Sequence, residues 1–157
     1  VIENTLLPFK NQVGESLIYA IFKNKWVEQE LSNTYAALKL LNNAQLDDLS
    51  MNLASQISGG QMKLLQLVRT LVSKPKLMLL DEPGAGIHPL LAKELFKLIK
   101  ELRDKEGITL FIIEHRLELL FDIVDRVLVM HRGKVIFDGK PHEALEDKRV
   151  KEAYLGG

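Results

Sequence analysis

The stretch from Ile57 to Pro83 constrains the fold more than any other part of the chain. It opens with Ser58-Gly-Gly-Gln61, where a serine N-cap and a glutamine three positions later form a helix capping box. Helix N-termini carry unpaired N–H groups and the positive end of the dipole, and glycine there lets an anion approach the backbone. The sequence therefore predicts a helix N-terminus suited to the terminal phosphate of a nucleotide.

The same stretch continues as a helix and then a strand. From Met62 onward, apolar residues recur at the spacing of a helix, at Leu64, Leu65, Val68, Leu71 and Val72. Pro75 is predicted to end this helix. Residues 77–80 form an unbroken apolar run that is typical of a strand covered on both faces in a parallel sheet. Because ligands gather at the carboxyl ends of such strands, Asp81 and Glu82 become candidate functional carboxylates.

A second strand is predicted to follow a loop and a helix. Glycines at 84 and 86 permit a tight loop, and Pro89 fits the first turn of a helix that ends at Gly107. The buried stripe of this helix is predicted to consist of Leu91, Leu95, Leu98, Ile99 and Leu102. Residues 108–113 form the next apolar strand. A right-handed strand–helix–strand unit would bring Glu114 and His115 to the same edge as the two carboxylates.

The remaining segments have simpler patterns. Residues 14–53 are predicted to be helical, with breaks at Asn24 and at Asn42-Asn43, and with Leu31, Tyr35, Leu38 and Leu41 along one face of the middle helix. Further expectations are a short helix at 116–124, strands at 125–131 and 134–138 joined by a hairpin at Arg132-Gly133, and helix from Pro141 to Tyr154.

Composition limits the classes of function. The 157 residues are 46% hydrophobic, which suffices for one ordinary core, and 21 basic against 21 acidic residues leave no formal net charge. This balance gives no electrostatic case for nucleic acid or an anionic membrane surface, and Trp26 and Tyr35 lack the basic stripe of a base-stacking platform. The absence of cysteine excludes disulfides, and no apolar run reaches membrane-spanning length.

Four motifs together resemble the ATP-binding-cassette ATPases. Residues 57–61 resemble the signature motif, 77–83 the Walker B strand and 84–89 the D-loop, and His115 follows at the position of the H-loop histidine. The resemblance implies an α/β fold: part of a P-loop NTPase core with a mostly parallel sheet, plus an N-terminal helical subdomain. The implied division is a helical subdomain at 1–75, a core part with Walker B, D-loop and H-loop at 76–140, and a helical tail at 141–157.

No Gly-x4-Gly-Lys-Ser/Thr phosphate-binding loop occurs in the sequence. In the family that Walker A loop and its strand precede everything found here, so the chain resembles the later part of the family's domain, and we expect a fragment. Since the missing strand would pair beside the strand that carries Asp81, an apolar edge is expected to remain uncovered.

The resemblance also implies roles for individual residues. Asp81 would hold Mg²⁺ through water, Glu82 would orient or deprotonate the attacking water, and His115 would contact the γ-phosphate of ATP. The D-loop residues would be Gly84, Ala85 and Gly86. The alternative for Asp81 and Glu82 is a solvated acidic pair that caps a strand, and the alternative for His115 is an ordinary loop histidine. We expect the other histidines, His88, His131 and His142, to be surface residues.

In the family, the signature motif serves a second subunit. Ser58, Gly59, Gly60 and Gln61 would therefore close over ATP held by a partner ATPase subunit, in a homo- or heterodimer. The further implied partners are transmembrane permease subunits and, indirectly, a solute-binding protein, which would place the chain at the cytoplasmic face of the inner membrane.

Within the family, the chain is most similar to the ATP-binding subunit of branched-chain amino acid uptake systems. Residues 81–89, 112–115 and 153–157 carry this similarity, with departures at His88, usually asparagine, and Arg116, usually aspartate. A lipopolysaccharide-export ATPase of the same fold is one alternative. Another, for the chain taken alone, is a non-hydrolysing interaction module.

Overall fold

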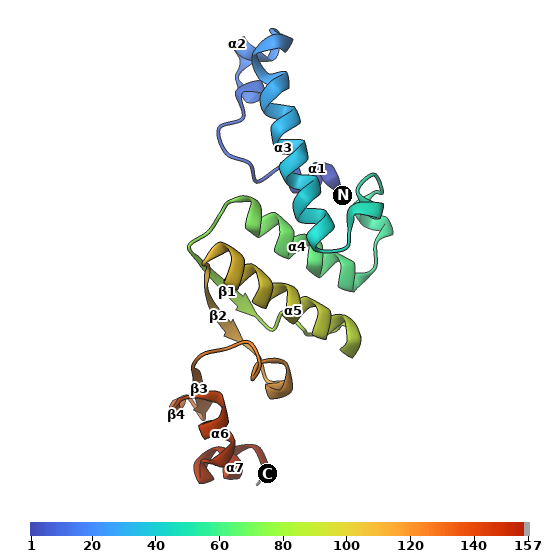
Figure 1. The fold of residues 1–157 in the computed structure, drawn as a ribbon. Coiled ribbons are helices and arrows are strands. Elements are labelled where there is room, and N and C mark those ends of the chain that lie inside the picture. The colour runs from blue at the N-terminus through green and yellow to red at the C-terminus, as the bar shows by residue number, and fades with distance from the viewer. Residues whose placement is uncertain (156–157) are drawn as a thin grey trace. The chain divides into compact units, whose positions relative to one another are not determined.

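The structure, a computed structural model, describes residues 1–155 and divides the chain into two compact units. The first unit comprises Val1–Ile113 and the second begins at Glu114 (Figure 1). The domain boundaries predicted after residues 75 and 140 stay a prediction.

The first unit holds most of the helices and one parallel strand pair. Its elements are α1 (Ile2–Leu6), α2 (Leu17–Ala20), α3 (Lys23–Asn43), α4 (Gly59–Val72), β1 (Leu77–Asp81), α5 (Pro89–Glu106) and β2 (Thr109–Ile113). Short 3₁₀ turns occur at Val13–Glu15, Asp47–Leu49 and Ala54–Gln56. The largest fully buried side chains of the unit are Leu41, Leu46, Leu65, Leu95, Ile99, Val68 and Thr5.

Helix α4 begins with the predicted capping box. The Ser58 hydroxyl accepts from the Gln61 amide at 3.3 Å, and the Gln61 side chain accepts from the Ser58 amide at 2.8 Å. The helix buries Gly60, Leu64, Leu65, Leu67, Val68, Leu71 and Val72. Both the helix and its apolar face are therefore confirmed.

Helix α3 departs from the predicted pattern at its beginning. The break predicted at Asn24 lies at Ile21 and Phe22 instead, between α2 and α3. Helix α3 starts at Lys23 and runs through Asn24, because an asparagine is tolerated in the first turn, where its side chain reaches solvent. The predicted end at Asn42-Asn43 is confirmed. The apolar face contributes to the core only at its C-terminal end, since Leu41 is buried whereas Tyr35 is 75% exposed.

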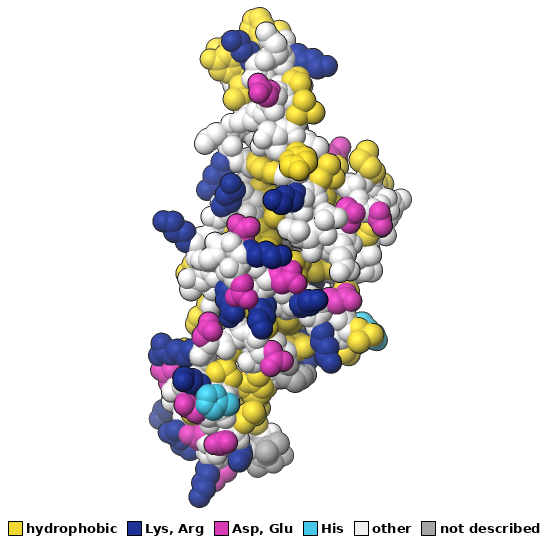
Figure 2. Space-filling view, viewed as in Figure 1, with side chains coloured by type: hydrophobic (Ala, Val, Ile, Leu, Met, Phe, Trp, Pro, Cys, Tyr) yellow, Lys and Arg dark blue, Asp and Glu magenta, His cyan; other side chains and the backbone are white. Residues whose placement is uncertain are grey.

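Hydrophobic side chains also gather on the surface around α2. Figure 2 shows them at the blue end of the ribbon of Figure 1, where Leu17 and Ile21 are 90% and 81% exposed. Within residues 1–155, no helix combines the length and apolarity needed to cross a bilayer.

Strands β1 and β2 pair in parallel, as predicted, with α5 between them in the chain. Their register places Leu79 opposite Phe111 and Asp81 opposite Ile113, and Gly107 ends α5 at φ 65°, in the left-handed conformation expected of it. The expectation that β1 is covered on both faces is wrong. Met78 is 4% exposed, but Leu79 on the opposite face is 70% exposed, because nothing in the described part of the unit packs on that face.

The second unit is built on an antiparallel hairpin. Its elements are β3 (Val127–His131), β4 (Lys134–Gly139), α6 (Pro141–Glu146) and α7 (Lys148–Leu155), which pack around Val129, Ala144 and Val150. Arg132 and Gly133, at φ 48° and 74°, form the predicted hairpin turn.

Two helix predictions fail in this unit. The helix predicted at 116–124 is only a 3₁₀ turn at Leu117–Leu119, because hydrogen bonds spanning three residues dominate there. The C-terminal helix is broken at Asp147, whose side chain accepts from the Arg149 amide at 2.8 Å and so starts α7. Gly156 and Gly157, the end of the similarity at 153–157, lie outside the described residues.

Candidate functional site

Two carboxylates stand where the parallel strand pair ends. Asp81 is the last residue of β1 and Glu82 follows it; both side chains are exposed. The Glu82 amide donates to the Ile113 carbonyl oxygen at 2.9 Å, which continues the strand pairing one residue past Asp81. The backbone that carries the carboxylates is therefore fixed by β2, as the sequence predicted for the carboxyl edge of a parallel sheet.

The backbone of Glu82 is strained. Its φ of 41° lies in the left-handed region, which is costly for a residue with a β-carbon. Its carbonyl oxygen accepts from the Ala85 amide at 3.0 Å and from Lys63 Nζ of α4 at 3.4 Å. Two donors thus stabilise a conformation that turns the chain immediately after the strand.

The turn that follows leads directly into α5. Gly84 is buried and Gly86 adopts φ 71°, so the loop predicted from the glycines is present. His88 is exposed, as predicted, and it is also the N-cap of α5, with its Nδ1 accepting from the Leu90 amide at 3.4 Å. Pro89 occupies the first helical position.

The Ser58–Gln61 segment lies at the N-terminus of α4 in the same unit. The amides of Gly59 and Gly60 precede the first intrahelical hydrogen bond, which Met62 donates to the Ser58 carbonyl oxygen at 2.9 Å. The surroundings of Gly59 are open, since a Cβ built there meets nothing within 4 Å. This helix end has the donors and the access that an anion requires.

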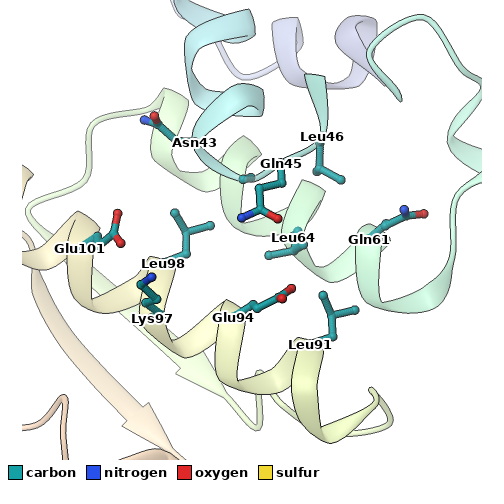
Figure 3. Close-up of a pocket in the computed structure, with 11 residues that line it drawn as sticks. Asn43, Gln45, Leu46, Gln61, Leu64, Leu91, Glu94, Lys97, Leu98 and Glu101 are labelled. Carbon is teal, nitrogen blue, oxygen red and sulfur yellow. The ribbon is translucent and has the colours of Figure 1, made fainter. Parts of the chain in front are cut away.

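A pocket of about 410 Å³ lies between α4, α5 and the segment after α3 (Figure 3). Its wall is mixed, with acidic, basic and amide side chains beside leucines. The residues in Figure 3 that carry these groups are Asn43, Gln45, Gln61, Glu94, Lys97 and Glu101. Asp81 and Glu82 do not line it, so this pocket is separate from the carboxylates.

A smaller hollow of about 230 Å³ does include Asp81, together with Lys63 and Pro83. Within residues 1–155 no group of three or more His, Cys, Asp or Glu side chains gathers as a metal site. A cation at this edge would therefore find the carboxylate of Asp81 and, next to it in the chain, that of Glu82. Such a donor set fits Mg²⁺, which keeps several waters and takes one or two protein carboxylates.

His115 belongs to the second unit, two residues beyond the end of β2. Its side chain is 63% exposed, and its Nδ1 lies 3.4 Å from Glu114 Oε1. The Glu114 side chain is fully buried, and the same oxygen accepts from the amides of His115 and Arg116 at 3.1 and 3.2 Å. The predicted site residues thus divide into Ser58–Gln61 with the carboxylates and turn in one unit, and His115 in the other.

Sequence reasoning missed Lys63 and the anchoring role of Glu114. Lys63 was only a polar position between apolar ones, and nothing in the spacing indicates contact with a residue nineteen positions away. Glu114 was recognisable only as a carboxylate directly after an apolar strand, which does not by itself indicate that its side chain is buried and accepts from two amides.

Comparison with known proteins identifies the family of the chain. A family model described as ABC transporter matches residues 3–85, and one described as branched-chain amino acid ATP-binding cassette transporter matches residues 134–157. Relatives include the probable branched-chain amino acid transport ATP-binding proteins LivG of Methanocaldococcus jannaschii, 39% identical, and of Archaeoglobus fulgidus, 35% identical. Each alignment covers 99% of this chain, and respectively 62% and 60% of the relative.

The fold has solved counterparts. One is the ADP conformation of an ATP-binding cassette of an ABC transporter, at 37% identity and a TM-score of 0.76, covering 99% of this chain and 63% of that one. An α/β fold of the P-loop NTPase type is thereby confirmed, and the chain spans less than two thirds of these relatives. With the ABC transporter model matching more than half of its residues, this chain belongs to the ABC transporter family.

Proposed function

We propose that the chain is the later part of the ATP-hydrolysing subunit of an ABC importer for branched-chain amino acids. The match at residues 134–157 and the LivG relatives support import over a lipopolysaccharide-export role. A second ATPase subunit, permease subunits and a solute-binding protein are the proposed partners. The subunit would work at the cytoplasmic face of the inner membrane, attached through the permease.

Within this function, the carboxylates at the end of β1 have separate tasks. Asp81 would hold Mg²⁺ through water, and Glu82 would orient or deprotonate the water that attacks ATP. His115 would contact the γ-phosphate, and Gly84–Gly86 would form the D-loop. Bound Mg²⁺ supplies charge stabilisation for phosphoryl transfer, so the task of these residues is positioning.

The signature segment is proposed to act on the nucleotide of the partner subunit. An anion-binding helix end is useful only when a phosphate is brought to it, and Ser58–Gln61 would complete an ATP sandwich between two subunits. A nucleotide that binds the closed pair about 10⁴-fold better than the open one would invert a 1:99 equilibrium. ATP binding would thus close the pair, and hydrolysis would release it.

The observation that carries the proposal is the backbone of Glu82. The residue directly after Asp81 is held in a costly left-handed conformation by hydrogen bonds from Ala85 and Lys63. Strain of this kind is found at functional sites, and here it turns the chain directly after the two carboxylates.

The test uses Glu82→Gln in a protein in which the chain is joined to the upstream, phosphate-binding part of the cassette. The variant should trap ATP in a stable dimer, measured by size-exclusion chromatography, and should lose turnover. Asp104→Asn, on the exposed side of α5, is the matched carboxylate control. Hydrolysis by Glu82→Gln at the normal rate would refute the role of Glu82.

A second candidate applies to the 157 residues alone, a non-hydrolysing interaction module. It is favoured by the absence of a Gly-x4-Gly-Lys-Ser/Thr loop from the sequence. The chain alone should show no measurable ATPase activity and only weak nucleotide binding by calorimetry. Turnover by the chain that Glu82→Gln abolishes would overturn this candidate.

A further inference from the structure

The two glycines at the start of α4 have different surroundings. A Cβ placed on Gly59 meets nothing within 4 Å. Gly60 is buried, and a Cβ placed there would overlap Leu91 Cδ2 and lie 3.3 Å from Leu91 Cγ and 3.6 Å from Ile87 Cγ2. An anion approaching the helix end can use the open side at Gly59, but the side of Gly60 is already occupied by this chain.

The residue that occupies this space comes from the first turn of α5. Figure 3 shows Leu91 projecting from α5 toward α4, on the same side as Gln61. Ile87, which precedes the helix, approaches the same point. Ile87 follows the Gly84–Gly86 turn directly, and Leu91 lies in the first turn of α5, to which that turn leads. The contact therefore connects the start of α4 with the segment that follows the carboxylates.

We propose that Leu91 is a positioning residue for the Ser58–Gln61 segment, and that Gly60 is glycine in order to admit Leu91. The leucine fills the volume that a β-carbon at position 60 would take. It thereby fixes where α4 begins relative to the turn after β1. A displacement of that turn would move Ser58–Gln61 with it, and the value of this coupling for catalysis rests on the function proposed above.

This assignment differs from a requirement for glycine imposed by a ligand. If only the approach of a phosphate demanded glycine, alanine at position 60 would be tolerated by the folded chain whatever stands at position 91. If Leu91 demands it, alanine is costly only while the leucine is present. A double-mutant cycle therefore separates the two explanations.

The cycle is measured as the midpoint of urea unfolding of the 157-residue chain, followed by the fluorescence of Trp26, its single tryptophan, which lies in the first unit. Gly60→Ala should lower the midpoint by about 0.5–1.5 M, because it overpacks the contact. Gly59→Ala is the matched control, with a change below about 0.3 M. In the Leu91→Ala background, Gly60→Ala should leave the midpoint unchanged or raise it; an equal loss in both backgrounds overturns the proposal.

A local measurement distinguishes positioning from general stability. Leu91→Ala should accelerate amide hydrogen exchange at Gln61, whose N–H donates to Ser58, and Leu91→Met should restore the protection. Leu98→Ala removes a buried leucine of the same helix about 10 Å further along and should lower the urea midpoint without this local change. Identical exchange patterns for Leu91→Ala and Leu98→Ala would refute the positioning role. Neither measurement uses ATP, so a failure of the proposed function would leave the result intact.

Discussion

Lys63 Nζ donates to the backbone carbonyl oxygen of Glu82 across 3.4 Å, which joins the helix of the Ser58–Gln61 segment to the end of β1. The same oxygen accepts from the Ala85 amide at 3.0 Å. Because one acceptor serves a helix side chain and a turn amide, the conformation of Glu82 depends on both elements. The two parts of the proposed ATPase site in this unit are therefore mechanically connected.

Removing the lysine should loosen this connection without unfolding the unit. Lys63→Met keeps most of the aliphatic stem and loses one hydrogen bond, so we expect a loss of about 0.5–1 kcal/mol in the free energy of unfolding. Exchange of the Ala85 amide should accelerate roughly two- to fivefold, because its acceptor becomes less fixed. The control is Lys97→Met on α5; equal exchange at Ala85 in both variants would show that Lys63 does not hold the turn.

Because Glu82 has a left-handed conformation, we predict that replacing it by glycine raises the stability of the chain and abolishes the activity. Glu82→Gly relieves the strain and should stabilise the chain by about 0.5–1 kcal/mol in urea unfolding, even after the entropic cost of glycine. In a completed cassette the same change would remove the carboxylate and abolish turnover. Ala85 lies three residues later and does not have a positive φ. Ala85→Gly should therefore lower the free energy of unfolding by about 0.5–1 kcal/mol, because glycine loses more conformational entropy on folding. If Glu82→Gly destabilises as much as Ala85→Gly does, relief of the backbone strain does not outweigh the loss of the side chain at position 82.

The sequence was sufficient for the elements whose cause is local. The capping box of Ser58 and Gln61, the glycine stop at 107 and the turn at Arg132-Gly133 each follow from residues a few positions apart. The parallel pairing of β1 with β2 followed from the order of strand, helix and strand. Each of these predictions needed no knowledge of distant contacts.

The uncovered strand face and the missed contacts have non-local causes. The unbroken apolar run predicts that Leu79 is buried. Its burial depends, however, on whether another element of the fold packs on that face of the strand. The contact of Lys63 with Glu82, and that of Leu91 with Gly60, join positions 19 and 31 residues apart that no period connects. The motifs of the site could therefore be predicted from the sequence, but the contacts between them could not.

A pH-dependent contribution to stability is expected in the second unit. The Arg149 guanidinium, which hydrogen-bonds the Asp147 carboxylate, is the chief cause that lowers the pKa of Asp147 from 3.8 to about 2. Because the pKa in the folded state is depressed, the stabilisation is present above about pH 4 and is lost as the pH falls through about 2. Exchange protection of the Val150 amide, which also donates to Asp147, should fall in this window.

Asp147→Asn is the variant that isolates this effect. It should lower the protection of Val150 at pH 5 and flatten its dependence between about pH 4 and pH 2. Asp138, whose pKa is also lowered by its hydrogen bonds with Arg126, titrates in the same unit, so Asp138→Asn serves as the comparison. A steep loss of Val150 protection that persists in Asp147→Asn would assign the effect to another group.

The bare face of the parallel strand pair predicts self-association. Leu77, Leu79, Phe111 and Ile113 are each more than half exposed on this face, and within the described residues β1 pairs with β2 alone. Leu79→Ser should shift the chain toward monomer in analytical ultracentrifugation at high concentration, with little change in unfolding free energy, because the side chain is already in water. Met78→Ala, the neighbour on the buried face, should cost about 2–4 kcal/mol and leave association unchanged or increase it. A wild-type chain that stays monomeric and melts cooperatively would show that this face needs no cover.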